Sequence, residues 1–394
     1  ALLGSRVDQV RSLCGPKFKA MQFCQGAVCR SWLVLAIPAC LHAADVASFR
    51  TQALPSPGCR RDRIGGQGIG PGSRETWTLL VHDKLGALNR TALVFQPNTA
   101  NTTRAAPLVL AFGGQDSTST SFAGLHEFDA WAQRDGWIMV YPDPVADGPA
   151  NESGGSLGWN IGTNADASTC IHPLPNPVFR GCHTSCIASG ECGPCAWSTC
   201  RDDVAFVMQL LEALATKLCV DLSRVHLLGQ SNGGMLVHKL AQELPGRFAS
   251  FVSHSGLPLL GYLDGNAYTL VTQRNLLSGT SSLAIAGRSD TNIPPCGGVS
   301  ASGWIYEGVN RSLGTWAAVN GCSRDLVAAH TPYEGGTLNM VCLEHTACTD
   351  GTTVMQCTYD GGHAVWPDQP RADELVWSFM QNASRPPHSG ATQG

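Results

Sequence analysis

A serine in a glycine-rich turn is the first residue of this sequence that could do chemistry. The segment LLGQSNGGM, residues 227–235, places Ser231 two residues from a glycine on each side, after an apolar run and before a helical pattern. Gly229 and Gly233 allow a strand-to-helix turn so tight that side chains would collide there, which is the setting of a nucleophilic serine. Because a serine hydroxyl is a weak nucleophile by itself, Ser231 needs a base and a group that orients the base.

Two later residues fit those roles. Asp290 follows the apolar run SSLAIAG, and His363 follows the run TTVMQCTY, so both come at the ends of predicted strands. The chain order serine, acid, histidine is one of the known orders of a catalytic triad. We therefore predict Ser231 as the nucleophile, His363 as the base and Asp290 as the acid. The weaker candidates break this order, lie too close to His363 or fall in irregular stretches: His254, Asp264, His330, His345 and Asp360.

The same serine motif occurs a second time, in GGSLG at residues 154–158, with Ser156 at its centre. A loop precedes it and no helical periodicity follows it, so the context that the motif requires is missing. We interpret Ser156 as a loop serine.

Acyl transfer also needs N–H donors for the oxygen that becomes negatively charged. One donor is expected to be the backbone N–H of Asn232, directly after the nucleophile. The other is expected from the loop AFGGQDS, where glycines let the backbone approach closely, at Gly114 or Gln115.

Apolar runs that alternate with amphipathic stretches indicate how these residues are positioned. Residues 76–83 and 90–97 predict an antiparallel start. Six further apolar runs cover 107–114, 137–143, 224–229, 248–256, 281–287 and 352–359, and four helical patterns cover 121–135, 202–218, 232–244 and 373–382. This alternation predicts an α/β fold with a mostly parallel central sheet and helices on both faces, in one domain.

The two ends of the chain are expected to lie outside that domain. Residues 21–43 have a weakly basic start, a short apolar stretch and small residues near a cleavage position, as in a secretory signal peptide; the alternative is a buried strand. We expect an upstream segment at 1–20, a flexible lead-in at 44–75, the α/β domain at 76–385 and a tail at 386–394.

Composition limits the partners and the compartment. Charged residues make up 14% of the chain, the net charge is −4 and no block of like charge occurs, which argues against nucleic acid and against an anionic membrane as partners. The 17 cysteines favour a secreted, disulfide-bonded protein. Five sequons add possible glycosylation sites at Asn89, Asn101, Asn151, Asn310 and Asn382.

Several motifs in order resemble those of α/β-hydrolases of the polyhydroxybutyrate depolymerase and feruloyl/acetylxylan esterase kind. They lie between about residues 105 and 380 and read LAFGGQDST, IMVYPDP, GWNIG, CRDDVAFV, VDLSRVHLLGQSNGGM, LPGRFASFVSHSG, AGRSDTNIPP and GGHAVWP. The resemblance implies the same triad, Ser231, Asp290 and His363. It also implies that Trp159 and Trp366 line the substrate pocket.

The chain departs from that family in two places. Phe112-Gly113 stands where the family has His-Gly at the oxyanion loop. Two residues separate His363 from Trp366, where the family usually has one, which bears on the expected role of Trp366.

A cysteine-rich insert, CHTSCIASGECGPCAWSTC at residues 182–200, precedes one predicted helix. Cys192 and Cys195 have the spacing of zinc ligands and His183 is near, but no second such pair matches them. We therefore predict disulfides that brace a long loop, as the resemblance also implies, and no metal. Without residues 1–43, 13 cysteines remain, so at least one is expected to be free or paired with another chain.

Together these features predict a secreted serine esterase that cleaves a carboxylic ester through an acyl-enzyme, with no metal or organic cofactor. Small esters, polyester oligomers and esterified polysaccharides all stay open as substrates. Two alternatives also stay open: a lipase or peptidase of the same fold, and a non-catalytic α/β-hydrolase-like binding protein.

Overall fold

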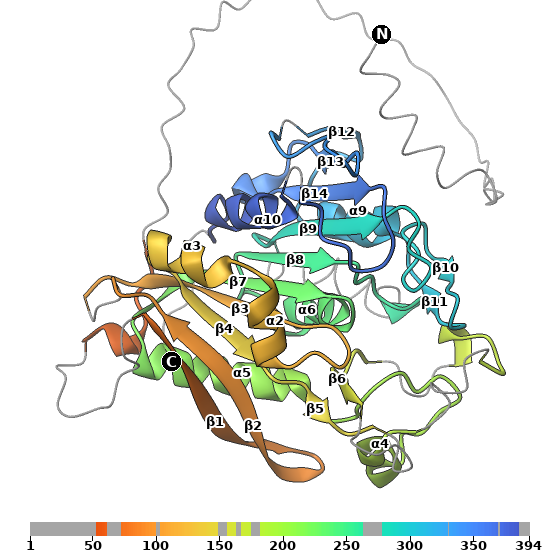
Figure 1. The fold of residues 1–394 in the computed structure, drawn as a ribbon, viewed down its shortest axis with the longest axis horizontal. Coiled ribbons are helices and arrows are strands. Elements are labelled where there is room, and N and C mark those ends of the chain that lie inside the picture. Colours follow the sequence, from red (N-terminus) through yellow and green to blue (C-terminus); the bar gives the residue numbers. More distant parts are fainter. Residues whose placement is uncertain are drawn as a thin grey trace, which may run out of the picture.

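The apolar runs of the sequence form one ten-stranded sheet in the order β1-β2-β4-β3-β7-β8-β9-β14-β13-β12 (Figure 1). The computed structural model describes residues 53–60, 72–99, 103–148, 156–162, 167–174, 182–262, 278–329, 331–368 and 371–385. The strands from β4 to β14 in this order pair in parallel. They are β4 (Ile138–Pro142), β3 (Ala106–Phe112), β7 (Val220–Gln230), β8 (Ser250–His254), β9 (Ser281–Gly287) and β14 (Val354–Tyr359).

Antiparallel strands close both edges of the sheet. They are β1 (Ser73–Asp83) and β2 (Gly86–Gln96) at one edge, and β13 (Val341–His345) and β12 (Leu326–Ala328) at the other. The predicted fold class, an α/β fold with a mostly parallel sheet, is therefore confirmed.

Helices cover both faces of the sheet (Figure 1). One face carries α5 (Asp203–Lys217), α6 (Asn232–Glu243) and α9 (Val309–Val319), and the other carries α2 (Ser119–Leu125), α3 (Phe128–Asp135) and α10 (Ala372–Gln381). Alternate residues of β3 point to different cores: Leu108 and Leu110 belong to the first, and Val109 and Ala111 to the second. Because both faces are buried, the central strands are continuous apolar runs.

Short elements complete the described chain. They are η1 (Pro57–Arg60), β5 (Val145–Ala146), β6 (Leu157–Gly158), η2 (Ala167–Thr169), α4 (Thr184–Ser189), β10 (Gly298–Val299), β11 (Ile305–Tyr306) and η4 (Thr349–Gly351).

The helix expected over residues 121–135 is two helices. Thr118 and Ser121 form a capping box at the start of α2, and His126 has extended backbone angles that end it before α3 begins. The break turns the His126 imidazole toward α10, where its Nδ1 lies 3.2 Å from the carboxylate of Asp373. A contact to a helix more than 240 residues away carries no local sequence signal. His345 also differs from expectation, since it ends strand β13.

Part of the predicted lead-in is bound to the domain. The N–H of Ser56 donates to the carbonyl of Val220 at 2.8 Å, and Cys59 forms a disulfide with Cys219, directly before β7. The predicted segments at 1–20 and 21–43, the tail at 386–394, and Asn101, Asn151, Asp264 and His330 lie outside the described residues. In the ranges given above, no helix has the length and apolar character needed to cross a bilayer.

Three buried histidines make the folded domain sensitive to acid. Burial lowers the pKa of His226, His238 and His254 to about 3 each, from an ordinary value of 6.5. Between those two values the unfolded chain binds protons that the folded chain does not, so the free energy of unfolding falls as the pH drops below about 6.5.

His238 offers the clearest test, because neither of its ring nitrogens has a hydrogen-bond partner. Between pH 8 and pH 5, the free energy of unfolding should fall by about 2 kcal/mol less in His238→Leu than in the wild type, because the variant lacks this histidine. Urea unfolding at both pH values measures this difference. His82→Leu is the control, because His82 is exposed. An equal loss in wild type and His238→Leu would contradict the prediction.

Candidate active site

Ser231 stands at the sharp turn between β7 and α6. Its backbone angles are φ 53° and ψ −120°, a strained conformation for a residue with a side chain. The turn closes because of two glycines. A Cβ at Gly229 would lie 2.2 Å from the carbonyl oxygen of Gly233, and a Cβ at Gly233 would lie 2.3 Å from that of Phe112. Glycine at both positions therefore lets the start of α6 pack directly on β7 and β3.

The structure brings Ser231, His363 and Asp290 together. The Ser231 Oγ lies 2.9 Å from His363 Nε2, and His363 Nδ1 lies 2.8 Å from Asp290 Oδ2. The three residues follow β7, β14 and β9, which end at the same edge of the sheet, as parallel strands must. The Asp290 carboxylate is buried, and the imidazole of His363 is about one fifth exposed, at 21%.

Backbone contacts hold Asp290 in place. Its Oδ1 accepts hydrogen bonds from the N–H groups of Asn292 and Ile293, both at 2.9 Å, so that Oδ2 is left for His363. Gly287 lets the two loops cross, because a Cβ there would lie 2.4 Å from the carbonyl oxygen of Gly362. The acid and the histidine are thus positioned by loops in backbone contact.

His254 supports the loop that carries His363. Its Nε2 donates to the carbonyl of Val365 at 3.1 Å, which fixes the tautomer because a carbonyl can only accept. Burial lowers the pKa of His254 to about 3, so the ring stays neutral. Next to His363, Ala364 has a positive φ of 53° and its N–H donates to Ser255 Oγ at 3.1 Å. The sequence order excluded His254 from the triad, but did not show this supporting position.

The expected oxyanion residues lie beside the nucleophile. A Cβ at Gly114 would lie 3.1 Å from the Cβ of Ser231, so the backbone of this loop passes directly next to it. Gln115 lines the same pocket as Ser231, with its side-chain amide donating to Ser156 Oγ at 3.0 Å. Asn232 begins α6, where the first backbone N–H groups of a helix have no partner within the helix. Ser156 of the second motif contacts other loop residues as well: its Oγ donates to Asp116 Oδ1, and its carbonyl accepts from the Asp147 N–H.

Trp159 does not line the pocket. It is fully buried, its Nε1–H donates to the carbonyl of Gly113 at 2.9 Å, and its backbone N–H donates to Asn232 Oδ1 at 2.7 Å. Its ring also meets Phe112 edge to face, with centroids 5.3 Å apart. Trp159 therefore packs against and hydrogen-bonds the loop that is expected to hold the oxyanion. Phe112 packs on Trp159 at the position where the family has histidine.

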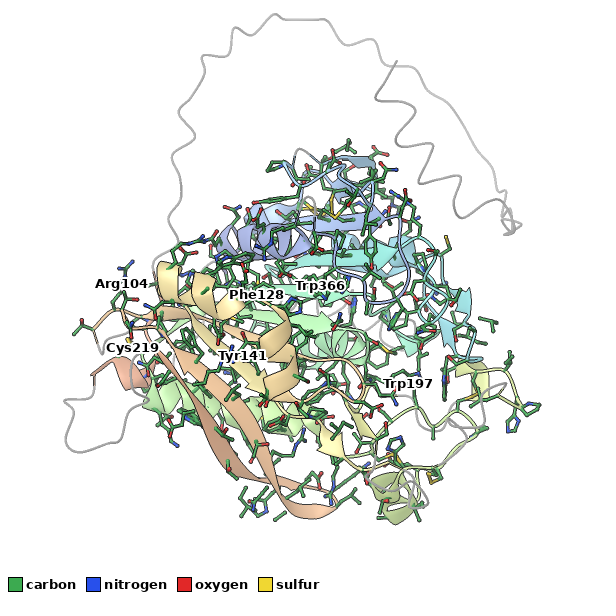
Figure 2. All side chains as sticks on the ribbon, viewed as in Figure 1. Arg104, Phe128, Tyr141, Trp197, Cys219 and Trp366 are labelled. Atoms are coloured by element: carbon green, nitrogen blue, oxygen red, sulfur yellow. A yellow bond between two sulfur atoms is a disulfide. The ribbon has the colours of Figure 1, made fainter. Side chains whose placement is uncertain are left out.

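Trp366 is also absent from the pocket lining. Its ring lies between two histidines, with centroids 4.1 Å from His254 and 4.6 Å from His126. It packs on the core beneath α2 and α3, near Phe128 (Figure 2). The extra residue between His363 and Trp366 agrees with this different placement.

A pocket of about 340 Å³ opens at Ser231 and His363. Its other lining residues are Gln115, Trp197, Asn292, Ile293, Ala301, Ser302, Trp304 and Tyr306. None of the aromatic residues in this wall was predicted from the sequence. Two sequence features could have indicated this wall: the segment GWIY at 303–306 and the tryptophan of the cysteine-rich insert. Only the fold shows that they meet.

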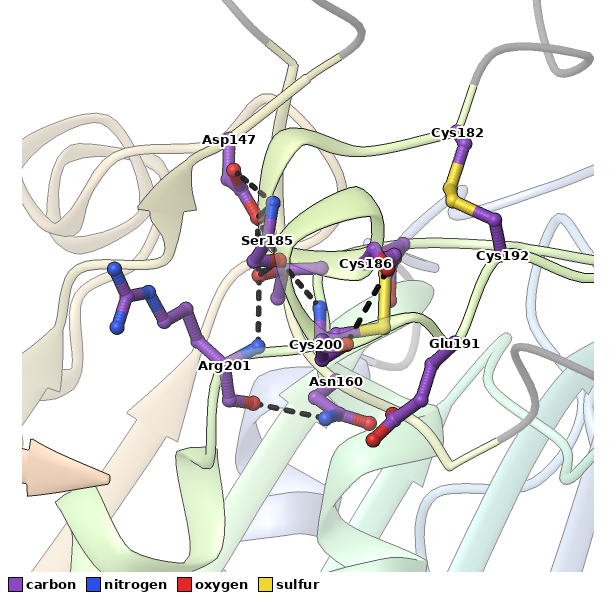
Figure 3. The surroundings of a disulfide bond; sticks show 12 residues. Asp147, Asn160, Cys182, Ser185, Cys186, Glu191, Cys192, Cys200 and Arg201 are labelled. Carbon is purple, nitrogen blue, oxygen red and sulfur yellow. Dashed lines mark hydrogen bonds between the residues drawn. A yellow bond between two sulfur atoms is a disulfide. The ribbon is translucent and has the colours of Figure 1, made fainter. Parts of the chain in front are cut away.

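The cysteine-rich insert is held by disulfides. Cys182 pairs with Cys192, and Cys186 with Cys200 (Figure 3), while Cys195 pairs with Cys170 outside the insert. Asp147 ties α4 to the domain, because its carboxylate accepts hydrogen bonds from the Ser185 N–H and the Thr199 hydroxyl. The prediction of disulfides is confirmed.

The zinc alternative is wrong, since Cys192 and Cys195 belong to different disulfides. Two further bonds join Cys322 to Cys348 and Cys342 to Cys357. Cys296 is disulfide-bonded as well. The expectation of one cysteine that is free or paired with another chain applies to the chain without residues 1–43 and stays a prediction. Within the described ranges, no group of three or more His, Cys, Asp or Glu side chains is arranged to hold a metal ion.

Comparison with known proteins decides the fold family. The structure of the acetyl xylan esterase from Aspergillus awamori matches with a TM-score of 0.50 and 16% identity, over 79% of this chain and 100% of that chain. The chain has the α/β-hydrolase fold. A poly(3-hydroxybutyrate) depolymerase from Bordetella parapertussis, LpqC, overlaps less, with a TM-score of 0.34 and 18% identity over 57% of this chain and 70% of its own.

Sequence comparison gives a match over the turn that carries Ser231. The family model of the prolyl oligopeptidase family matches residues 199–282. Feruloyl esterase B from Piromyces equi is 24% identical over 198 residues, which are 49% of this chain and 33% of that protein. The chain thus spans about a third of that relative's length. The resemblance expected from the motifs is confirmed.

Proposed function

We propose that this α/β-hydrolase is a secreted serine esterase that cleaves carboxylic esters through an acyl-enzyme. The observation that carries the proposal is the continuous hydrogen-bonded series from Ser231 Oγ through His363 to Asp290, with both distances below 3 Å. The similarity to a feruloyl esterase and the fold shared with an acetyl xylan esterase support ester substrates.

The first half of the reaction forms the acyl-enzyme. His363 Nε2 takes the proton of the Ser231 hydroxyl as Oγ attacks the ester carbonyl, while the Nδ1–H of His363 donates to Asp290 and stabilises the imidazolium. The carbonyl oxygen becomes negative and is held by the N–H groups of Asn232 and of Gly114 or Gln115. The imidazolium then gives its proton to the departing alcohol.

The second half repeats these steps with water. His363 takes a proton from water, the resulting hydroxide attacks the acyl carbon, and the proton returns to Ser231 Oγ as the acid leaves. Every proton moves among Ser231, His363, water and the product, so the cycle needs no metal and no organic cofactor.

The proposed location follows from the disulfides. Thirteen cysteines, from Cys59 to Cys357, are disulfide-bonded, and such bonds persist in oxidising compartments. Three sequon asparagines in the described region are exposed, namely Asn89, Asn310 and Asn382, which supports glycosylation at these positions.

Covalent labelling tests the proposed function. We expect a fluorophosphonate to label Ser231 in the full chain, produced in an oxidising secretory pathway, and hydrolysis of p-nitrophenyl acetate to fall in proportion to labelling. Mass spectrometry of the peptide that contains Ser231 measures the site. Methyl ferulate, p-nitrophenyl butyrate, a hydroxybutyrate oligomer and a proline p-nitroanilide then compare ester with peptide substrates. A folded protein that neither reacts nor hydrolyses any of them would support the non-catalytic alternative.

A further inference from the structure

The cysteine-rich insert reaches the active-site pocket through one residue, Trp197. The insert has an outer part, with Ile187 and Cys192 exposed, and an inner part, residues 195–200, that is buried. Trp197 is only 7% exposed, yet it lines the pocket together with Ser231 and His363. Figure 2 labels Trp197 below and to the right of Trp366.

Trp197 forms an aromatic wall with two residues from a distant segment. Its Nε1–H donates to the Tyr306 hydroxyl at 3.3 Å, and its ring centroid lies 6.2 Å from that of Trp304. Trp304 and Tyr306 also line the pocket. Two segments more than 100 residues apart in the chain therefore build one wall.

The Cys170–Cys195 disulfide connects these two segments through residue 170, which is bonded covalently to the first and bridged to the second by backbone hydrogen bonds. Cys195 lies two residues before Trp197, and Cys170 pairs with Trp304 in an isolated β-bridge. Next to it, the N–H of Ile171 donates to the carbonyl of Gly303 at 2.9 Å. The disulfide and these backbone contacts together fix the backbone of one tryptophan relative to that of the other.

The inner part of the insert also contacts the brace of the oxyanion loop. The hydroxyl of Ser198 donates to the carbonyl of Trp159, whose N–H binds Asn232 Oδ1. The insert is therefore connected both to the pocket wall and to the residues behind the nucleophile.

We propose that Trp197 is a specificity-determining residue, which limits the size of the ester group that enters the pocket, and that the Cys170–Cys195 disulfide holds it in place. This inference rests on the proposed esterase function. A volume of about 340 Å³ is at the lower end for ligand pockets. A tryptophan in such a wall therefore decides which groups fit.

The test measures kcat/KM of the full chain for two ester series, p-nitrophenyl esters from acetate to decanoate and acetates of alcohols of increasing size. We expect Trp197→Ala to raise the ratio of long to short ester in one series by about tenfold or more. The change should come from a lower KM for the long ester, while the KM for the shortest ester changes less. Trp197→Phe, which keeps a ring, should restore most of the wild-type ratio.

Matched variants separate this change in ester selectivity from a general loss of rigidity in the protein. Trp77→Ala, on edge strand β1, should leave the ratio unchanged. Cys170→Ala/Cys195→Ala should shift the ratio in the same direction as Trp197→Ala, whereas Cys182→Ala/Cys192→Ala, which removes a bond in the outer part of the insert, should not. Trp197→Leu provides the same test if the alanine variant unfolds.

The outcomes distinguish the two proposals. An unchanged ratio in folded Trp197→Leu or Trp197→Ala, with hydrolysis still dependent on Ser231, would overturn this inference and leave the esterase function standing. If the wild type shows no hydrolysis that depends on Ser231, the esterase function itself fails, and the inference fails with it.

Discussion

Ser231→Ala is expected to lower kcat for ester hydrolysis by about 10⁶-fold, the loss seen when a triad nucleophile is removed. The alanine variant keeps the pocket and the oxyanion N–H groups, but no atom remains to form the acyl-enzyme. Because Ser231 has a positive φ in the native turn, alanine keeps the same backbone requirement and the fold should be retained. Steady-state rates on p-nitrophenyl acetate, with thermal unfolding as a check on the fold, measure the effect.

The second serine motif provides the matched control. Ser156→Ala changes the same residue type in the same motif, but Ser156 bonds only to loop partners, Gln115 and Asp116 among them. We expect it to keep activity within about an order of magnitude of wild type. A loss in Ser231→Ala no larger than the loss in Ser156→Ala would exclude Ser231 as the nucleophile.

Asp290→Asn is expected to lower kcat by about 10⁴-fold, as the same change does in a serine protease. The Oδ1 of Asp290 accepts two backbone N–H groups, so an asparagine would keep its carbonyl oxygen there and turn its NH₂ group toward His363. His363 Nδ1 would then have to accept, Nε2 would carry the hydrogen, and the ring could not take the proton of Ser231. Stopped-assay kinetics over long incubation measure the residual rate.

Asp360→Asn is the control for the acid. Asp360 lies three residues before His363, but its carboxylate bonds to Arg288 and Asn339 at the surface, and Arg288 lowers its pKa. Activity within a few-fold of wild type is expected for this variant. Equal losses in the two variants would show that charge near the loop, and not the orientation of the imidazole, limits the rate.

The sheet and the positions of the three candidate triad residues followed from local patterns. Continuous apolar strands, helical spacing and glycines at a tight turn are all properties of neighbouring residues, so β3, β7, α6 and β9 were predictable close to their observed bounds. The break between α2 and α3 was not predictable, because it depends on the contact of His126 with Asp373, which is distant in the sequence.

The pocket wall was not predictable for the same reason. Trp197, Trp304 and Tyr306 come from separate loops, and no periodicity relates them. A tryptophan beside a family motif, such as Trp159 or Trp366, looks like a pocket residue in sequence. In the fold, Trp159 is fully buried and Trp366 is partly buried against the second core, and neither lines the pocket.

The disulfide between Cys59 and Cys219 has a mechanical consequence. It encloses a loop of 160 residues that includes β1, β2, β3, β4 and α5. Tension applied to the chain ahead of Cys59 would pass through the sulfur bridge directly into central strand β7, which leads to Ser231. Edge strands β1 and β2, which lie inside the enclosed loop, would carry no load while the bridge is intact. With the bridge intact, a molecule pulled from that end should not extend until β7 separates from the sheet. After a reductant is added, it should also extend by the length of the enclosed loop.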